Sequence, residues 1–173
     1  IEAALDEVTS EGMFTAINSL RSAFKTLAEG ADQVTYANIV LTSAKNMTLV
    51  LKQFDMKLKN IQDQQIYDLS VAVDEVNATL QKIHSLNESI RKDIFLQGAN
   101  DSSRYGANEL LDARNLLLDD LANYGDIRVT DNEDGTIKIE MNGHVIMDGQ
   151  KYDSLTLVRN TNDTVSLRWD STG

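Results

Sequence analysis

The segment Asp131-Asn-Glu-Asp-Gly135 places several oxygen ligands close together, which is the arrangement that a bound cation would need. Calcium loops of the EF-hand type place an aspartate five residues before an invariant glycine. Counting back from Gly135 puts Thr130 at that position, so the first ligand is missing. The sequence therefore predicts a solvated hairpin turn at residues 131–135 and no metal site.

The two histidines also lack companion ligands at the spacing of a metal site. His84 and His144 fall in different predicted elements, a helix and a hairpin, and neither has the companion spacing of a zinc site. The chain has no cysteine, which excludes disulfides, thiol catalysis and cysteine-based metal sites. It contains no phosphate loop, no G-x-S-x-G and no G-x-G-x-x-G. We therefore predict no catalytic, cofactor-binding or metal-binding residues, no cofactor and no enzymatic activity.

Arg114 is the residue whose position suggests a specific contact. It shares the apolar stripe of a helix predicted at 109–124 with three leucines, Leu110, Leu117 and Leu121. A cation on such a stripe needs a partner, or its stem must carry the charge out to solvent. We expect an ion pair with a neighbouring long helix, with Asp74 and Glu75 as equal candidates. Contact with a partner protein is the alternative.

The long helix is predicted by what its segment lacks. Residues 31–97, between Gly30 and Gly98, contain neither glycine nor proline, the usual breakers of helices. An unbroken helix of this length would extend roughly 100 Å. Its apolar stripe follows heptad spacing and slips by one position at Gln62–Gln65. Such a slip either relaxes a supercoil or marks a bend or a short interruption of the helix. We expect an elongated antiparallel helical bundle in which helices at 13–27 and 109–124 pack along this helix and bury its seam. Ser10 is the predicted N-cap of the first helix, and Asp32 is the predicted N-cap of the long one.

After Gly125 the apolar period changes from 3.6 to 2, which indicates strands. Asn142-Gly143 is a strong hairpin signal, and the alternation suits about five short antiparallel strands. The predicted fold class is therefore α+β, with one very long helix in the bundle followed by a small antiparallel β meander. We expect a helical domain at 1–125 and a small antiparallel β domain at 126–173, which looks incomplete at its last strand.

Charge limits the partners that this chain can have. Its formal net charge is −11, whereas binding to nucleic acid or to an anionic membrane surface needs a basic face. No apolar run approaches the ~20 residues of a transmembrane helix. We expect neither a nucleic-acid partner nor a membrane partner.

The chain contains two patterns, at residues 7–20 and at residues 86–114, that resemble those of the flagellar hook-associated protein 1 family. Glu7-Val-Thr-Ser-Glu-Gly12 and Thr15-Ala-Ile-Asn-Ser-Leu20 are similar to the family pattern E-P-S-x-x-G-L-x-x-A-L-N-x-F. Leu86-Asn-Glu-Ser-Ile90 with Asn108-Glu-Leu-Leu-Asp-Ala-Arg114 is similar to L-N-x-x-I … N-D-L-L-D-x-R-D. The chain departs from these patterns at Val8, where proline is common, and at Asn115, where aspartate is usual.

The resemblance implies a structural subunit that joins hook to filament in the bacterial flagellum, secreted and extracellular. It implies packing against other copies of itself and against neighbouring axial proteins, the hook protein and hook-associated protein 3. It also implies an export chaperone that binds terminal segments missing from this core. Two alternatives remain: another axial protein, either hook-associated protein 3 or a flagellin-like protein, and a non-flagellar extracellular helical module for binding or adhesion.

Overall fold

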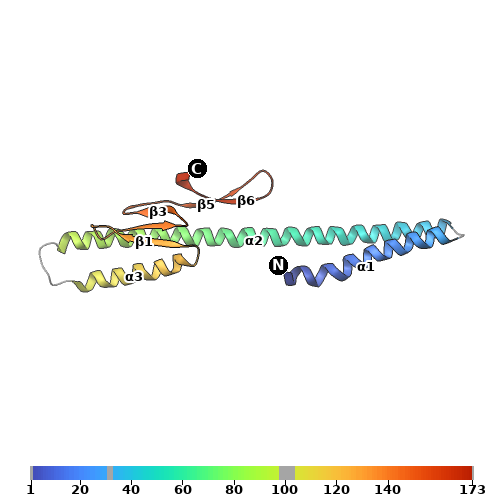
Figure 1. The fold of residues 1–173 in the computed structure, drawn as a ribbon, viewed down its shortest axis with the longest axis horizontal. Coiled ribbons are helices and arrows are strands. Elements are labelled where there is room, and N and C mark those ends of the chain that lie inside the picture. The colour runs from blue at the N-terminus through green and yellow to red at the C-terminus, as the bar shows by residue number, and fades with distance from the viewer. Residues whose placement is uncertain (1, 31–32, 98–103, 173) are drawn as a thin grey trace. The chain divides into compact units, whose positions relative to one another are not determined.

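The computed structural model describes residues 2–30, 33–97 and 104–172. In these ranges it has three α-helices, α1 (Glu2–Glu29), α2 (Gln33–Gln97) and α3 (Arg104–Ala122) (Figure 1). Six strands and a final 3₁₀ turn follow: β1 (Ile127–Asp131), β2 (Ile137–Met141), β3 (His144–Asp148), β4 (Lys151–Tyr152), β5 (Leu155–Arg159), β6 (Val165–Trp169) and η1 (Asp170–Thr172). By contact the chain forms two compact units, residues 1–66 and 67–173.

The very long helix and the antiparallel β meander predicted from the sequence are both confirmed. Helix α2 continues without a break through Gln62–Gln65, and the boundary between the units follows directly after this slip of the stripe. The division of the chain into domains at residue 125 stays a prediction. In the structure, the strands lie in the same compact unit as α3 and the second half of α2.

Two predicted helix starts are wrong. Helix α1 begins at Glu2, well before the predicted cap Ser10, and α3 begins at Arg104 and not at Glu109. Both helices carry a glycine inside, Gly12 in α1 and Gly106 in α3, at a cost of about 1 kcal/mol each. Neighbouring helical residues therefore outweigh the glycines. The predicted cap of α2, Asp32, lies outside the described residues.

The first unit pairs α1 with the first half of α2 as antiparallel neighbours (Figure 1). Among its described side chains, the buried apolar ones are small, Ala16 and Ala23. The large side chains at heptad spacing are exposed or only half-buried. Ile17, Phe24, Leu51 and Leu58 are exposed, and the half-buried ones are Met13, Leu20, Leu27, Met47, Phe54 and Ile61. The expectation that the seam is buried inside the bundle is therefore wrong here, because two helices cover only one side of each other's apolar stripe.

In the second unit, β1, β2, β3 and β4 form one antiparallel sheet in sequence order, and β5 and β6 form a separate hairpin. Asn142 and Gly143 both have positive φ angles, 50° and 83°, as the predicted primed turn requires. The sixth strand, which the sequence did not reveal, is the two-residue β4 that pairs with the end of β3. Two residues are too few to show an alternating pattern.

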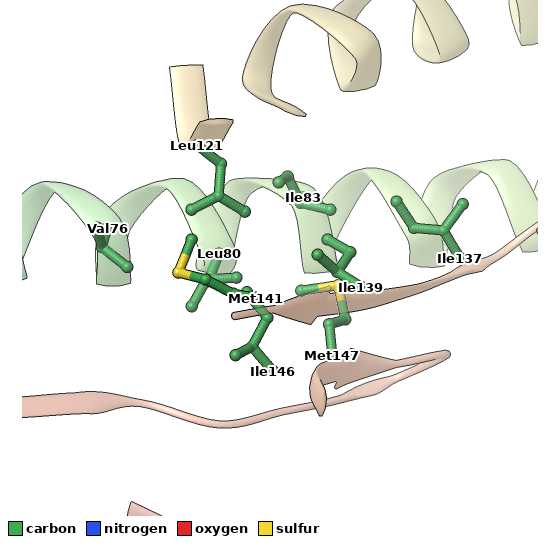
Figure 2. Close-up of a cluster of buried hydrophobic side chains, with 9 residues drawn as sticks. All are labelled: Val76, Leu80, Ile83, Leu121, Ile137, Ile139, Met141, Ile146 and Met147. Atoms are coloured by element: carbon green, nitrogen blue, oxygen red, sulfur yellow. The ribbon is translucent and has the colours of Figure 1, made fainter. Parts of the chain in front are cut away.

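A β-bulge shapes the core of this unit. Ile139 pairs with Met147 and Glu140 pairs with Val145, so Ile146 is an extra residue in β3. Because of this extra residue, Ile146 and Met147 are both buried although they are adjacent. Nine side chains form the core (Figure 2): Val76, Leu80 and Ile83 of α2, Leu121 of α3, Ile137, Ile139 and Met141 of β2, and Ile146 and Met147 of β3.

The same helix therefore has an exposed stripe in one unit and a buried stripe in the other. We expect Leu80→Ala, which removes a side chain with 0% exposure, to lower the free energy of unfolding by about 2–5 kcal/mol. Leu58→Ala is the matched control on the same helix, and we expect it to cost less than about 1 kcal/mol, since Leu58 is already exposed. Urea unfolding followed by circular dichroism measures both. Equal losses would contradict the burial described here.

Candidate functional site

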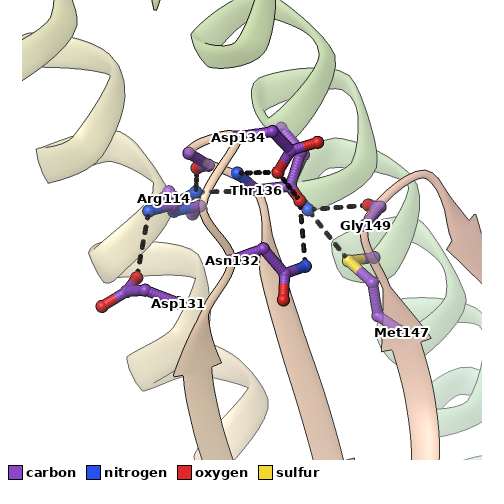
Figure 3. A network of polar contacts seen from close by, with 9 residues as sticks. Arg114, Asp131, Asn132, Asp134, Thr136, Met147 and Gly149 are labelled. Atoms are coloured by element: carbon purple, nitrogen blue, oxygen red, sulfur yellow. Dashed lines mark hydrogen bonds and ion pairs between the residues drawn. The ribbon is translucent and has the colours of Figure 1, made fainter.

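Arg114 lies at the centre of a buried polar cluster (Figure 3). It comes from the stripe of α3 that also holds Leu121, and its side chain points between the elements of the second unit. Its Nη1 donates hydrogen bonds to the carbonyl oxygen of Gly135, at 2.8 Å, and to Oδ1 of Asn87, at 3.0 Å. Its Nη2 lies 3.9 Å from Oδ1 of Asp131, whose side chain is exposed. Burial lowers the pKa of Arg114, and the charge of Asp131 opposes that shift.

Asn87 is the second member of the cluster, and the sequence analysis missed it. Buried residues of α2 recur at alternating spacings of three and four: Val73, Val76, Leu80, Ile83, Asn87 and Ile90. An asparagine thus occupies a seam position where an apolar residue is usual. Its Nδ2 donates to the carbonyl oxygen of Gly149 at 3.2 Å and to Sδ of Met147 at 3.4 Å. The cluster therefore ties together α2, α3, the β1–β2 turn and the β3–β4 turn.

The ion pair predicted for Arg114 with Asp74 or Glu75 is wrong. Glu75 instead accepts a hydrogen bond from the hydroxyl of Tyr124, the residue ten positions after Arg114. Because α3 runs antiparallel to α2, Tyr124, which follows the end of α3, contacts α2 at Glu75, twelve residues before Asn87. The true partners of Arg114 are neutral acceptors together with one exposed carboxylate.

Residues 131–135 form the predicted hairpin turn, but this turn is only partly solvated, because Gly135 is half-buried and the next residue, Thr136, is buried. Oδ1 of Asp134 accepts hydrogen bonds from the amide of Thr136, at 3.1 Å, and from its hydroxyl, at 2.6 Å. Because of these bonds the pKa of Asp134 lies below its usual value. Gly135 has a φ of +80°, and a Cβ there would lie 2.2 Å from Cδ1 of Ile94. The absence of a side chain therefore lets the turn lie directly on α2.

A second turn repeats this structure. Asn160-Thr-Asn-Asp-Thr164 joins β5 to β6, and its Asn162 accepts hydrogen bonds from the amide and the hydroxyl of Thr164, at 3.3 and 2.7 Å. Asn160 donates to Thr164, as Asn132 donates to Thr136. Asp163 has a φ of 60° where the first turn has glycine. The second turn is exposed throughout.

A serine, a histidine and an aspartate meet near the end of the chain, and their geometry is not catalytic. Nε2 of His144 lies 2.9 Å from Oδ2 of Asp153 and 3.4 Å from the hydroxyl of Ser171. Catalytic triads place the acid and the serine on opposite ring nitrogens. Here both lie at the same nitrogen, and Ser171 donates to Asp153 instead. The group fastens η1 to β3 and to the segment before β5.

Two further contacts attach the strands to α2. Nδ2 of Asn77 donates to the carbonyl oxygen of Leu155, and its Oδ1 accepts from the amide of Leu155, each at 2.8 Å. Nε2 of His84 lies 2.9 Å from the carbonyl oxygen of Gln150, and its ring lies 5.2 Å from the ring of Tyr152. Both histidines are thus engaged in separate places, as predicted.

The polar cluster around Arg114 connects secondary-structure elements. A guanidinium keeps its proton, and Nη1 of Arg114 donates to two oxygens, so the cluster holds strands and helices without exchanging protons. In the described ranges, no group of three or more His, Cys, Asp or Glu side chains could hold a metal ion. None of the described helices is long and apolar enough to cross a membrane.

The comparisons with known proteins agree with one another. The family model of the flagellar hook-associated protein FlgK helical domain matches residues 1–173. Flagellar hook-associated protein 1 of Bacillus subtilis (strain 168) is 23% identical over 182 residues, covering 96% of this chain and 34% of that protein. The flagellar hook junction protein FlgK from Burkholderia pseudomallei has a solved structure with a similar fold, at a TM-score of 0.71 and 20% identity, covering 95% of this chain and 28% of that one. The chain thus spans about a third of the length of these relatives.

We expect Arg114→Met to lower the free energy of unfolding by about 3 kcal/mol, because it leaves the buried acceptors on Asn87 and Gly135 without a donor. Arg128→Met is the matched control: Arg128 is exposed, and its loss should cost less than about 1 kcal/mol. Urea unfolding measures both. If Arg114→Met changed stability no more than its control, the cluster would not hold the unit together.

The stabilisation that Asp153 provides should depend on pH. Burial raises the pKa of Asp153, but hydrogen bonds from Ser171 and His144 outweigh it and hold the pKa below its usual value. A carboxyl group of this kind stabilises the fold above its unfolded pKa of about 3.9 and loses that effect as the pH falls through its folded value. We therefore expect Asp153→Asn to lower the melting temperature clearly at neutral pH and much less at about pH 3. An equal loss at both pH values would contradict this assignment.

Proposed function

Because this chain belongs to the family of the flagellar hook-associated protein FlgK, we propose that it acts as a structural subunit that joins hook to filament in the bacterial flagellum. Its partners in this role are other copies of itself and the neighbouring axial proteins, the hook protein and hook-associated protein 3. The role requires no catalysis, and the polar clusters of the second unit suit it, because they connect helices and strands.

The observation that carries the proposal is the exposed apolar surface of the first unit. Exposed large side chains lie on both of its helices, among them Phe14, Phe24, Leu49 and Met56. Monomeric soluble proteins rarely leave large contiguous apolar surfaces uncovered. Neighbouring subunits packed side by side along an axial assembly would cover these residues, and the long helix presents them at repeated intervals.

The same role implies an extracellular location and an export pathway. We propose that the protein is secreted and works outside the cell as part of the flagellum, and that an export chaperone binds segments outside this chain. The absence of cysteine suits export of an unfolded chain, since no disulfide has to form before or after transport.

Deletion of the gene in its own bacterium tests the proposal. We expect hooks without attached filaments and loss of swimming, both restored by the full-length wild-type gene. A full-length variant with Phe24→Asp and Leu49→Asp should fail to restore them, because the two charges would have to be buried between subunits.

The matched control carries the same two added charges at exposed polar positions, Ser22→Asp and Gln53→Asp, and we expect it to restore swimming. Electron microscopy of hooks and a motility assay on soft agar give the two readouts. Attached filaments in the deletion strain would overturn the junction role. Full rescue by the Phe24→Asp and Leu49→Asp variant would overturn the role of this surface.

A further inference from the structure

An open groove near the end of α2 is lined by apolar and charged side chains. It measures 670 Å³ and is lined by Arg91, Lys92, Ile94, Phe95 and the turn residue Asp134. Phe95 is 85% exposed, more than any other large apolar side chain in the described part of the chain. Ile94 is held in place, because Gly135 packs against it.

The charged residues that line the groove differ in whether they have a partner. Asp134 is bound by Thr136 and lies close enough to Arg91 for that cation to lower its pKa. Lys92 has no ion-pair partner among the described residues and is exposed. The groove therefore offers an apolar contact beside an unneutralised cation.

The exposed face of α3 has the complementary character. Leu116 is 64% exposed, and four exposed carboxylates surround it at helical spacing: Glu109, Asp112, Asp119 and Asp120. In the described ranges none of the four has an ion-pair partner. Glu109 and Asp112 are three residues apart, and like charges at this spacing destabilise a helix. A cationic partner would remove this cost.

We propose that the groove of one molecule binds the acidic face of α3, with Leu116 as its apolar anchor, from a second copy of this chain. The face cannot reach the groove of its own molecule, because Arg114 directs the opposite side of α3 toward α2. The two surfaces differ, so the contact is heterologous, and repeated heterologous contacts generate rings or helical assemblies. The inference rests on the proposed function, since it names a surface through which the subunits would pack.

The absence of cysteine in the chain allows a direct test. Phe95→Cys and Leu116→Cys are made in separate samples of the 173-residue chain, mixed at high concentration and treated with a short bis-maleimide. Both side chains are largely exposed, so neither change disturbs the core. We expect cross-linked dimers in the mixture and few in either variant alone. The control mixture replaces Phe95→Cys with Tyr67→Cys, an exposed position elsewhere on α2.

Charge reversal separates this contact from random collision. Adding Lys92→Glu to the Phe95→Cys protein should lower the cross-linked fraction several-fold, and adding Asp119→Lys to the Leu116→Cys protein should restore it. Cross-linking equal to the Tyr67→Cys control, or mainly between two Phe95→Cys molecules, would overturn the proposal. The junction role would stand in that case if the full-length gene still restored filament attachment.

Discussion

The arrangement of the second unit depends on the hydrogen bond from Arg114 to the carbonyl oxygen of Gly135. Apolar burial brings the sheet against α2, but it does not by itself decide where along the helix the sheet lies. A guanidinium with two neutral acceptors has strict directions for its donors, so it selects one position. Asn87 extends that selection to the next turn of the sheet through Gly149. The hydrogen bonds offset part of the free-energy cost of burying a cation, and they define one register between helices and strands.

The two matching turns show how one residue decides between packing and exposure. Both have asparagine first, threonine fifth, and a side-chain oxygen at the third position that accepts from the threonine. At the fourth position Gly135 lies against Ile94 of α2, where a Cβ would clash, whereas Asp163 carries a side chain and its turn is exposed. The local hydrogen bonds thus build both turns, and glycine at the fourth position permits close contact with a helix.

Much of this could be predicted from the sequence, and the rest had physical reasons to stay hidden. The long helix follows from the absence of breakers, and Arg114 stood out because a charge interrupted a row of leucines. Its partners did not stand out, since a main-chain carbonyl has no sequence signature and Asn87 carries no charge. Continuing the alternating spacing of three and four from Val76 would have reached Asn87. The exposed seam of the first unit could not be predicted, because the pattern shows which face is apolar but not how many neighbours cover it.

Asn77 has a consequence for how the protein behaves among other chains. Its side-chain amide presents one donor and one acceptor to the backbone of Leu155, as a neighbouring strand would. A helix residue thereby occupies a pairing position at the edge of a two-stranded hairpin. Unpaired edges invite strands from other molecules and so promote aggregation. A single asparagine thus protects part of an edge that a crowded assembly of identical chains would otherwise bring into repeated contact.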